Sequence, residues 1–250
     1  MNNEQIFKEE RHFQGLNYTL YTDGQPHPLL FFFHGFTGNR QTGIMGRGEV
    51  LANLGINVVA FDAPLHGDRS TQSFHGLTSS DKQKHIIDIV INYAHDAKWL
   101  YEQHLQYDRL ISKQPIFAFG VSMGSQTSFY LATIMKELQT IITLVGSPSF
   151  CEFYEWKKQK YGWEDNEEYQ KKQHEYRYLD PLINYHKFEN KKIFIGVGIK
   201  DEIVPLQYAR LLKDKLKEES YYYKEYDTAH ASTEAMLQDA YLFIKKALLH

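Results

Sequence analysis

The chain has 250 residues, 42% of them hydrophobic, with 18 Tyr and 16 Phe, so it is long and apolar enough to bury a sizeable core. Its formal net charge of −3 gives no electrostatic reason to expect nucleic acid or an anionic membrane as a partner. Cys151 is the one cysteine, which excludes an intrachain disulfide and favours a reducing compartment.

The start of the chain gives a further indication of its compartment. Residues 1–13 lack the basic segment followed by an apolar stretch that marks a signal peptide. No uninterrupted apolar run approaches the roughly 18 residues that a membrane span requires. We therefore expect a cytoplasmic protein that is not bound to a membrane.

Apolar runs alternate with amphipathic segments along the chain. A hairpin or two early strands are predicted at 11–21 around Gly15, and further strands are predicted at 28–35, 56–64, 115–120, 140–148, 191–198 and 220–226. Helices are predicted at 43–54, 80–107 with Ser80 or Asp81 near the cap, 122–139, 205–217 and 232–248. This alternation predicts one α/β domain over residues 1–250, with a mainly parallel sheet and helices on both of its faces.

One segment departs from this alternation. Residues 150–189 separate two predicted strands by about forty residues, far more than a simple crossover helix needs. The segment is highly charged and rich in aromatic residues, which predicts two or three amphipathic helices forming a small cap. The alternative is a long crossover helix that has no role in a functional site.

A serine between two glycines lies where the predicted strand at 115–120 becomes a helix, in Gly120-Val121-Ser122-Met123-Gly124. The alternative to a functional motif is a tight turn that happens to contain a serine. A strand, a sharp turn and a helix would hold the serine exposed at the sheet edge, and the helix N-terminus would stabilise nearby negative charge. We therefore predict that Ser122 is a nucleophile.

A serine nucleophile needs a histidine base, and the histidine needs a carboxylate that orients it and stabilises its charged form. With this serine motif the order along the chain is serine, acid, histidine. His230 lies between the last predicted strand and the last helix, where it can reach across the sheet edge, so it is the predicted base. The other histidines after the serine lie in the predicted cap or at the terminus: His174, His186 and His250.

The acid should follow a late strand, and Asp201 follows the strand at 191–198. Glu202 and Asp227 are the alternatives. Neighbouring positions on a loop usually point in different directions, which disfavours Glu202. Asp227 lies just before the predicted base rather than after a separate strand. Asp201 is therefore the predicted acid.

An acyl-transfer reaction also needs two N–H donors for the oxyanion of its tetrahedral intermediate. Met123, directly after the predicted nucleophile, should supply one, and Phe36 in the loop HGFTG at 34–38 should supply the other. His34 precedes this loop and could be mistaken for a base. We expect it instead to hold the loop by a hydrogen bond.

The sequence gives weaker indications about the substrate. Apolar residues near the predicted oxyanion donors, Phe150 among them, indicate an acyl pocket for short- to medium-chain esters. Trp156 in the predicted cap could also line this pocket, although aromatic residues on amphipathic helices usually only pack. The histidines form no H-E-x-x-H motif and there is no cysteine pair, so no metal is expected.

The motifs PLLFFFHGFTGN, FDAPLHGDRS, GVSMG, GIKDEIVP and TAH occur in the order and spacing of α/β-hydrolase-fold serine esterases. More closely, the chain resembles the small bacterial carboxylesterases related to dienelactone hydrolases and the catalytic domain of prolyl oligopeptidases. The resemblance covers nearly the whole chain and is weakest over 150–189. It implies an eight-stranded sheet, an acyl-enzyme mechanism, no cofactor, a triad of Ser122, Asp201 and His230, and the same two oxyanion donors.

The resemblance also gives roles to the segment FDAPLHGDR, in which Asp62, His66 and Arg69 look like residues that brace a loop. The resulting prediction is a serine hydrolase that cleaves small-molecule carboxylic esters. A serine peptidase, a thioesterase or an acyltransferase of the same fold is the alternative among enzymes. A non-catalytic ligand-binding protein is the alternative from a different class. The oligomeric state stays open.

Overall fold

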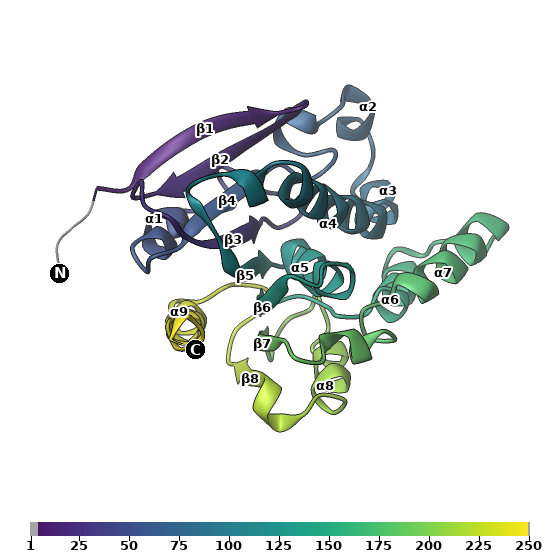
Figure 1. Cartoon of the computed structure of the whole chain (residues 1–250). Coiled ribbons are helices and arrows are strands. Elements are labelled where there is room, and N and C mark those ends of the chain that lie inside the picture. Colours follow the sequence, from purple (N-terminus) through teal and green to yellow (C-terminus); the bar gives the residue numbers. More distant parts are fainter. Residues whose placement is uncertain (1–4, 250) are drawn as a thin grey trace.

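The computed structural model describes residues 5–249, apart from the Lys113 side chain. Its strands are β1 (Phe7–Phe13), β2 (Leu16–Thr22), β3 (His27–Phe33), β4 (Asn57–Phe61), β5 (Ile111–Val121), β6 (Leu138–Leu144), β7 (Lys192–Gly198) and β8 (Tyr221–Tyr226). They form one eight-stranded sheet in the order β1-β2-β4-β3-β5-β6-β7-β8, shown in Figure 1. The pairs β1–β2 and β2–β4 are antiparallel and the other pairs are parallel. The predicted α/β fold and its mainly parallel sheet are confirmed.

The helices cover both faces of this sheet. They are α1 (Arg47–Ala52), α2 (Gln72–His75), α3 (Ser79–Lys84), α4 (Ile86–Gln103), α5 (Met123–Ile134), α6 (Cys151–Tyr161), α7 (Glu167–Leu179), α8 (Gln207–Lys213) and α9 (Glu234–Leu248). Apolar residues of α4, α5 and α8 pack in one buried cluster, and those of α1 and α9 pack in another. Phe31 and Phe33 of β3 belong to the first cluster and Phe32 to the second, as the alternation of side chains along a strand requires.

The long helix predicted over 80–107 is divided in two. Its first part, α3, begins after Thr78, whose hydroxyl accepts a hydrogen bond from the Asp81 N–H at 3.1 Å and so caps the helix. The chain turns tightly at His85, whose N–H donates to the Lys82 carbonyl, and α4 follows. The predicted cap at Ser80 or Asp81 was therefore wrong by a few residues, because Thr78 supplies the capping oxygen.

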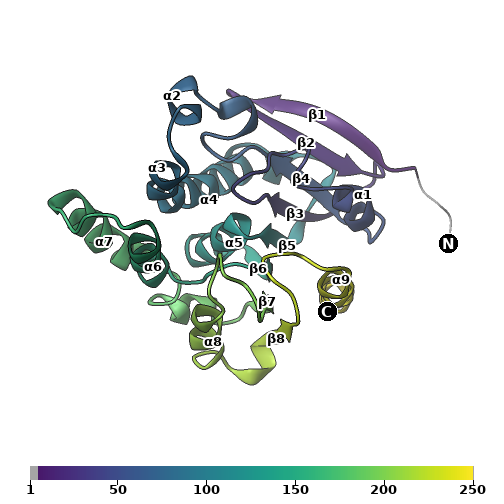
Figure 2. The same ribbon diagram turned by 180° about the vertical axis from the view of Figure 1, so that it is seen from behind.

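Residues 150–189 fold into α6, α7 and a short 3-10 turn at Tyr185–Phe188, in agreement with the predicted two or three helices. In both views α6 and α7 project from the side of the molecule at which β3 and β5 end (Figures 1 and 2). Buried Asp180 fixes the base of this segment, because its carboxylate accepts hydrogen bonds of 2.9 Å from the Ser149 hydroxyl and from the Phe150 and Cys151 N–H groups. The role of the segment as a cap stays a prediction.

Within residues 5–249, no helix combines the length and the apolar character needed to cross a membrane.

Candidate active site

Ser122 occupies a strained turn between β5 and α5. Its backbone angles are φ 57° and ψ −117°, a conformation that residues other than glycine rarely adopt. The flanking glycines make this turn possible. A Cβ on Gly120 would lie 2.0 Å from the Gly124 carbonyl oxygen, and a Cβ on Gly124 would lie 2.0 Å from the Phe33 carbonyl oxygen. The backbones approach too closely for any side chain at these two positions, which is why the serine lies between glycines.

The structure brings the predicted serine, acid and base together at the carboxyl ends of the strands. His230 Nε2 lies 2.8 Å from Ser122 Oγ, and His230 Nδ1 lies 2.7 Å from Asp201 Oδ2. The three residues follow β5, β7 and β8. The imidazole therefore hydrogen-bonds to the serine through one nitrogen and to the carboxylate through the other.

The Asp201 carboxylate is held in its charged form. Its side chain is only 2% exposed, and burial by itself would raise its pKa. Hydrogen bonds from His230 and from the N–H groups of Val204 and Ile203 outweigh that effect and hold the pKa of Asp201 below its ordinary value. A charged acceptor thus faces His230 Nδ1, which favours a proton on that nitrogen and leaves Nε2 to accept one from the serine.

The alternative residues lie elsewhere. Exposed Asp227 pairs with Lys200 at 2.6 Å, and exposed Glu202 does not take the place of Asp201 beside the imidazole. His174 lies on α7, where its Nε2 is 3.4 Å from the Tyr178 hydroxyl. The other two histidine candidates are His186, which lines a different cavity, and His250, which lies outside the described residues.

The loop after β3 lies against the serine. A Cβ on Gly35 would come within 3.5 Å of the Ser122 Cβ, so the loop backbone passes directly beside the turn that holds Ser122. The next residue is Phe36, whose N–H donates no main-chain hydrogen bond within residues 5–249. Met123 is the first residue of α5, a position where the N–H has no acceptor inside the helix.

His34 holds this loop, as the sequence predicted. It is 1% exposed, its Nδ1 lies 2.8 Å from the Gly35 carbonyl oxygen, and its Nε2 accepts a hydrogen bond from the Ala63 N–H at 3.1 Å. This arrangement requires the neutral ring with its proton on Nδ1. Burial lowers the pKa of His34 to about 4, which keeps the ring neutral near neutral pH.

The segment after β4 braces the same loop, in agreement with the roles expected for Asp62, His66 and Arg69. Asp62 accepts two hydrogen bonds of 2.6 Å from Arg40, one from its main-chain N–H and one from its guanidinium group. The Arg69 guanidinium group donates to the Asp62 carbonyl oxygen at 3.0 Å. His66 Nε2 lies 2.5 Å from the Phe36 carbonyl oxygen. The loop that carries Phe36 is therefore fixed from two sides.

The two residues predicted to line an acyl pocket have different surroundings. Phe150 is fully buried, with its ring centroid 5.5 Å from that of Tyr130, so its side chain belongs to the core and does not line an open pocket. Its place follows from the turn that Asp180 fixes, which sequence patterns did not reveal. Trp156 on α6 is half-buried and its ring stacks on Phe153 at 5.8 Å.

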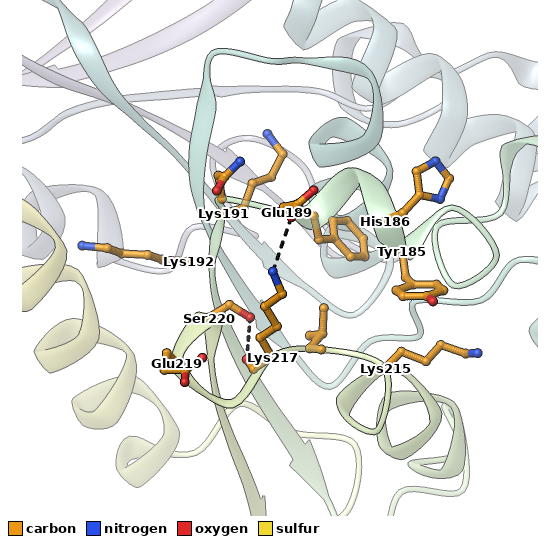
Figure 3. Close-up of a pocket in the computed structure, with 12 residues that line it drawn as sticks. Tyr185, His186, Glu189, Lys191, Lys192, Lys215, Lys217, Glu219 and Ser220 are labelled. Atoms are coloured by element: carbon orange, nitrogen blue, oxygen red, sulfur yellow. Dashed lines mark hydrogen bonds and ion pairs between the residues drawn. The ribbon is translucent and has the colours of Figure 1, made fainter.

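The structure also holds a cavity of about 460 Å³ that is separate from these residues. Figure 3 shows its lining, in which the Lys217 ammonium group lies 3.4 Å from a Glu189 carboxylate oxygen. Lys192, at the start of β7, and Ser220, just before β8, also line it. The cavity therefore lies at the amino ends of strands whose carboxyl ends lead to Asp201 and His230.

The chain is similar to several known proteins. Residues 45–242 match the model of the prolyl oligopeptidase family. The curated protein "Putative esterase YitV" of Bacillus subtilis (strain 168) is 26% identical over 196 residues, which cover 76% of this chain and 74% of that protein.

Solved structures share the fold. TT1662 from Thermus thermophilus has a TM-score of 0.74 at 17% identity, covering 98% of this chain and 99% of that chain. Acetyl xylan esterase 1 from a Thermoanaerobacterium species has a TM-score of 0.72 at 16% identity, covering 98% of this chain and 88% of that chain. The family match over most of the chain identifies the protein as a member of the prolyl oligopeptidase family and as a serine hydrolase, and the solved structures show its α/β-hydrolase fold.

Proposed function

We propose that the protein hydrolyses carboxylic esters through an acyl-enzyme formed on Ser122, with short- to medium-chain esters as substrates. One observation carries this proposal: the His230 imidazole is hydrogen-bonded to both Ser122 Oγ and Asp201, at 2.8 and 2.7 Å. A serine hydroxyl is a weak nucleophile near neutral pH, and this arrangement is the one that activates it.

Acylation begins when Ser122 Oγ attacks the ester carbonyl carbon while its proton passes to His230 Nε2. The Asp201 carboxylate, 2.7 Å from Nδ1, stabilises the imidazolium ion that results. The carbonyl oxygen becomes an oxyanion, and the N–H groups of Phe36 and Met123 are the donors we assign to it, each contributing about 3 kcal/mol to transition-state stabilisation. When the intermediate collapses, the bond to the alcohol oxygen breaks, and the alcohol leaves with the proton from Nε2.

Deacylation repeats these steps with water as the nucleophile. His230 Nε2 takes a proton from water as the water oxygen attacks the acyl carbon, and the same two N–H groups hold the second oxyanion. The bond to Ser122 Oγ then breaks. Oγ recovers its proton from Nε2, and the carboxylic acid leaves the restored enzyme.

The surroundings of the loop at 34–38, which carries Phe36, favour a substrate with an apolar acyl group. Phe36 is half-buried, and its ring centroid lies 5.2 Å from that of His66 and 6.4 Å from that of Phe74. This aromatic cluster would give an acyl chain an apolar wall next to the reacting carbonyl. We further infer that residues 150–189 act as a cap that limits the length of the chain.

The direct test is the hydrolysis of p-nitrophenyl esters, from acetate to octanoate, by wild type and Ser122→Ala. Ser128→Ala is the matched control, because that serine lies on α5 and its hydroxyl donates to the Gly124 carbonyl oxygen at 3.1 Å. We expect Ser122→Ala to lose about three to six orders of magnitude in kcat and the control to stay near wild type.

Two outcomes would contradict the proposal. Folded wild type that turns over no ester would direct the search to thioester or peptide substrates, and then to a binding role without catalysis. An active Ser122→Ala variant would show that another residue carries the reaction. Aminoacyl p-nitroanilides, assayed in parallel, would identify a peptidase by cleaving faster than the esters.

A further inference from the structure

Lys157 is a buried cation without an anionic partner. It lies on α6 and is 3% exposed, yet within residues 5–249 no hydrogen bond or ion pair reaches its ammonium group. Lysine is rarely buried to this extent unless it is paired, because a desolvated charge is costly. The ammonium group has three donors, and its nitrogen is not one of the fully buried side-chain atoms that lack a partner within residues 5–249, so water or an anion can reach it.

The neighbouring lysines of α6 have partners, which makes Lys157 distinct among them. Lys158 forms ion pairs with Asp165 at 2.9 Å and with Glu155 at 3.4 Å. Lys160 donates to the Glu202 carbonyl oxygen at 2.7 Å. The missing partner of Lys157 is therefore not a general property of this charged helix.

Aromatic rings surround the Lys157 ammonium group. It lies 4.9 Å from the ring centroid of Phe153, 5.3 Å from that of Trp156 and 5.6 Å from that of Tyr161. Cation–π attraction to these faces offsets part of the desolvation cost and orients the side chain. No hydrogen bond joins these residues to the ammonium group within residues 5–249, so its N–H groups stay available to an anion.

Lys157 also lies near the catalytic acid. The hydrogen bond from Lys160 to Glu202 ties α6 to the loop that begins at Asp201, and the Tyr208 hydroxyl donates to the Glu152 carbonyl oxygen at 3.2 Å. Burial and the charge of Lys160 lower the pKa of Lys157 to about 8, while the nearby Asp201 carboxylate raises it. The ammonium form therefore predominates near neutral pH, within electrostatic reach of Asp201.

Asp201 does not neutralise this charge directly. One of its carboxylate oxygens accepts from His230, and the other accepts from the N–H groups of Ile203 and Val204, each at 2.9 Å. Both oxygens are thus already engaged. A substrate that brings its own carboxylate would supply the acceptor that the protein does not.

We propose that Lys157 determines specificity by binding a carboxylate of the substrate, so that the enzyme prefers esters that carry a second, free carboxylate. This inference rests on the proposed ester hydrolysis at Ser122. A carboxylate matches the single positive charge and the N–H donors, and the rings around the ammonium group accept the carbon chain that bears it. The carboxylate belongs to the acyl part or to the alcohol part of the ester, and the experiment separates the two.

The test compares charged and neutral ester pairs by kcat/KM. The acyl pair is the p-nitrophenyl monoester of adipic acid against p-nitrophenyl hexanoate. The alcohol pair is acetoxybenzoate, with its free carboxylate, against its methyl ester. We expect wild type to prefer the charged member of one ester pair by about tenfold or more in kcat/KM, the scale of a close interaction between opposite charges. Which of the two ester pairs shows the preference identifies whether the carboxylate lies on the acyl or the alcohol part.

Lys157→Met removes the charge and keeps most of the volume. We expect this variant to lose about tenfold or more on the charged ester, to stay within about threefold of wild type on the neutral one, and to be rescued in part by Lys157→Arg. Lys158→Met is the control and should keep the preference. Equal losses on both esters, or an unchanged ratio, would overturn the inference while hydrolysis of the neutral ester by wild type still supports the proposed function.

The affinity for a free carboxylate tests the role of Lys157 without relying on turnover. Calorimetric titration of Ser122→Ala with the carboxylate product of the preferred pair, adipate for the acyl pair or hydroxybenzoate for the alcohol pair, should give an affinity that falls about tenfold when Lys157→Met is added. Unchanged binding, or no binding to either protein, would overturn the proposal. Failure of wild type to hydrolyse any ester would contradict the proposed function instead.

Discussion

His230 Nε2 and Ser122 Oγ lie 2.8 Å apart although 108 positions separate the two residues in the chain. The contact exists because β5, which leads to the serine, and β8, which leads to the histidine, run parallel in one sheet and end at the same edge. Asp201, which follows β7, is hydrogen-bonded to the other nitrogen of the same imidazole. The parallel strands thus bring the three side chains to one edge of the sheet, and the short segments after the strands set their orientation.

Removing the charge of the acid should almost abolish turnover. In Asp201→Asn the amide no longer stabilises the imidazolium ion and favours the wrong tautomer of His230, so kcat for p-nitrophenyl acetate should fall by about 10³ to 10⁴. Asp227→Asn is the control and should stay near wild type, because that carboxylate is exposed and pairs with Lys200. More than a tenth of wild-type activity in Asp201→Asn would rule out Asp201 as the acid.

The turn around Ser122 should not tolerate a methyl group at position 124. In Gly124→Ala the new Cβ would lie 2.0 Å from the Phe33 carbonyl oxygen, and this backbone contact cannot be relieved by a side-chain rotation. We expect a loss of more than about 3 kcal/mol in the free energy of unfolding, measured in urea, together with loss of activity. Gly76→Ala, where the nearest atom is 3.6 Å away, should cost little. Wild-type stability for Gly124→Ala would contradict the close approach of α5 and β3.

The neutral state of His34 should make stability depend on pH. Burial lowers its pKa to about 4 in the folded protein, below the ordinary value of 6.5. Because the folded-state pKa is the lower one, this stabilisation is fully present above about pH 6.5 and is lost as the pH falls toward about 4. Between about pH 7 and about pH 5, wild type should lose about 2 kcal/mol more unfolding free energy than His34→Asn. Equal slopes for the two proteins would contradict a buried neutral His34.

A cap role for residues 150–189 predicts that loosening α7 changes the preferred acyl chain. The Tyr176 hydroxyl donates to Asp88 on α4 at 2.8 Å, whereas Tyr178, two residues later, is 67% exposed. Tyr176→Phe should shift the ratio of octanoate to acetate turnover severalfold and leave acetate turnover near wild type, and Tyr178→Phe should change neither. A profile that Tyr176→Phe leaves unchanged would argue against the cap.

The sequence predicted the parts of this molecule that local pattern determines. Strands such as β3 are covered on both faces, so they appear as continuous apolar runs, and the glycines around Ser122 appear as a motif because their spacing is set by a turn. Properties that depend on tertiary contacts were missed. The burial of Phe150 follows from hydrogen bonds to Asp180 about thirty residues away, and Lys157 looks like any other lysine of a charged helix until its surroundings are known.

The most direct test of the central claim is the site of acylation. Wild type would be mixed with p-nitrophenyl acetate, quenched with acid within the first turnovers, and digested for peptide mass spectrometry. We predict one acetyl group on the peptide that contains Ser122, absent from Ser122→Ala and present in Ser128→Ala. An acetyl group on another residue, or turnover without any acetyl-enzyme in wild type, would contradict an acyl-enzyme on Ser122.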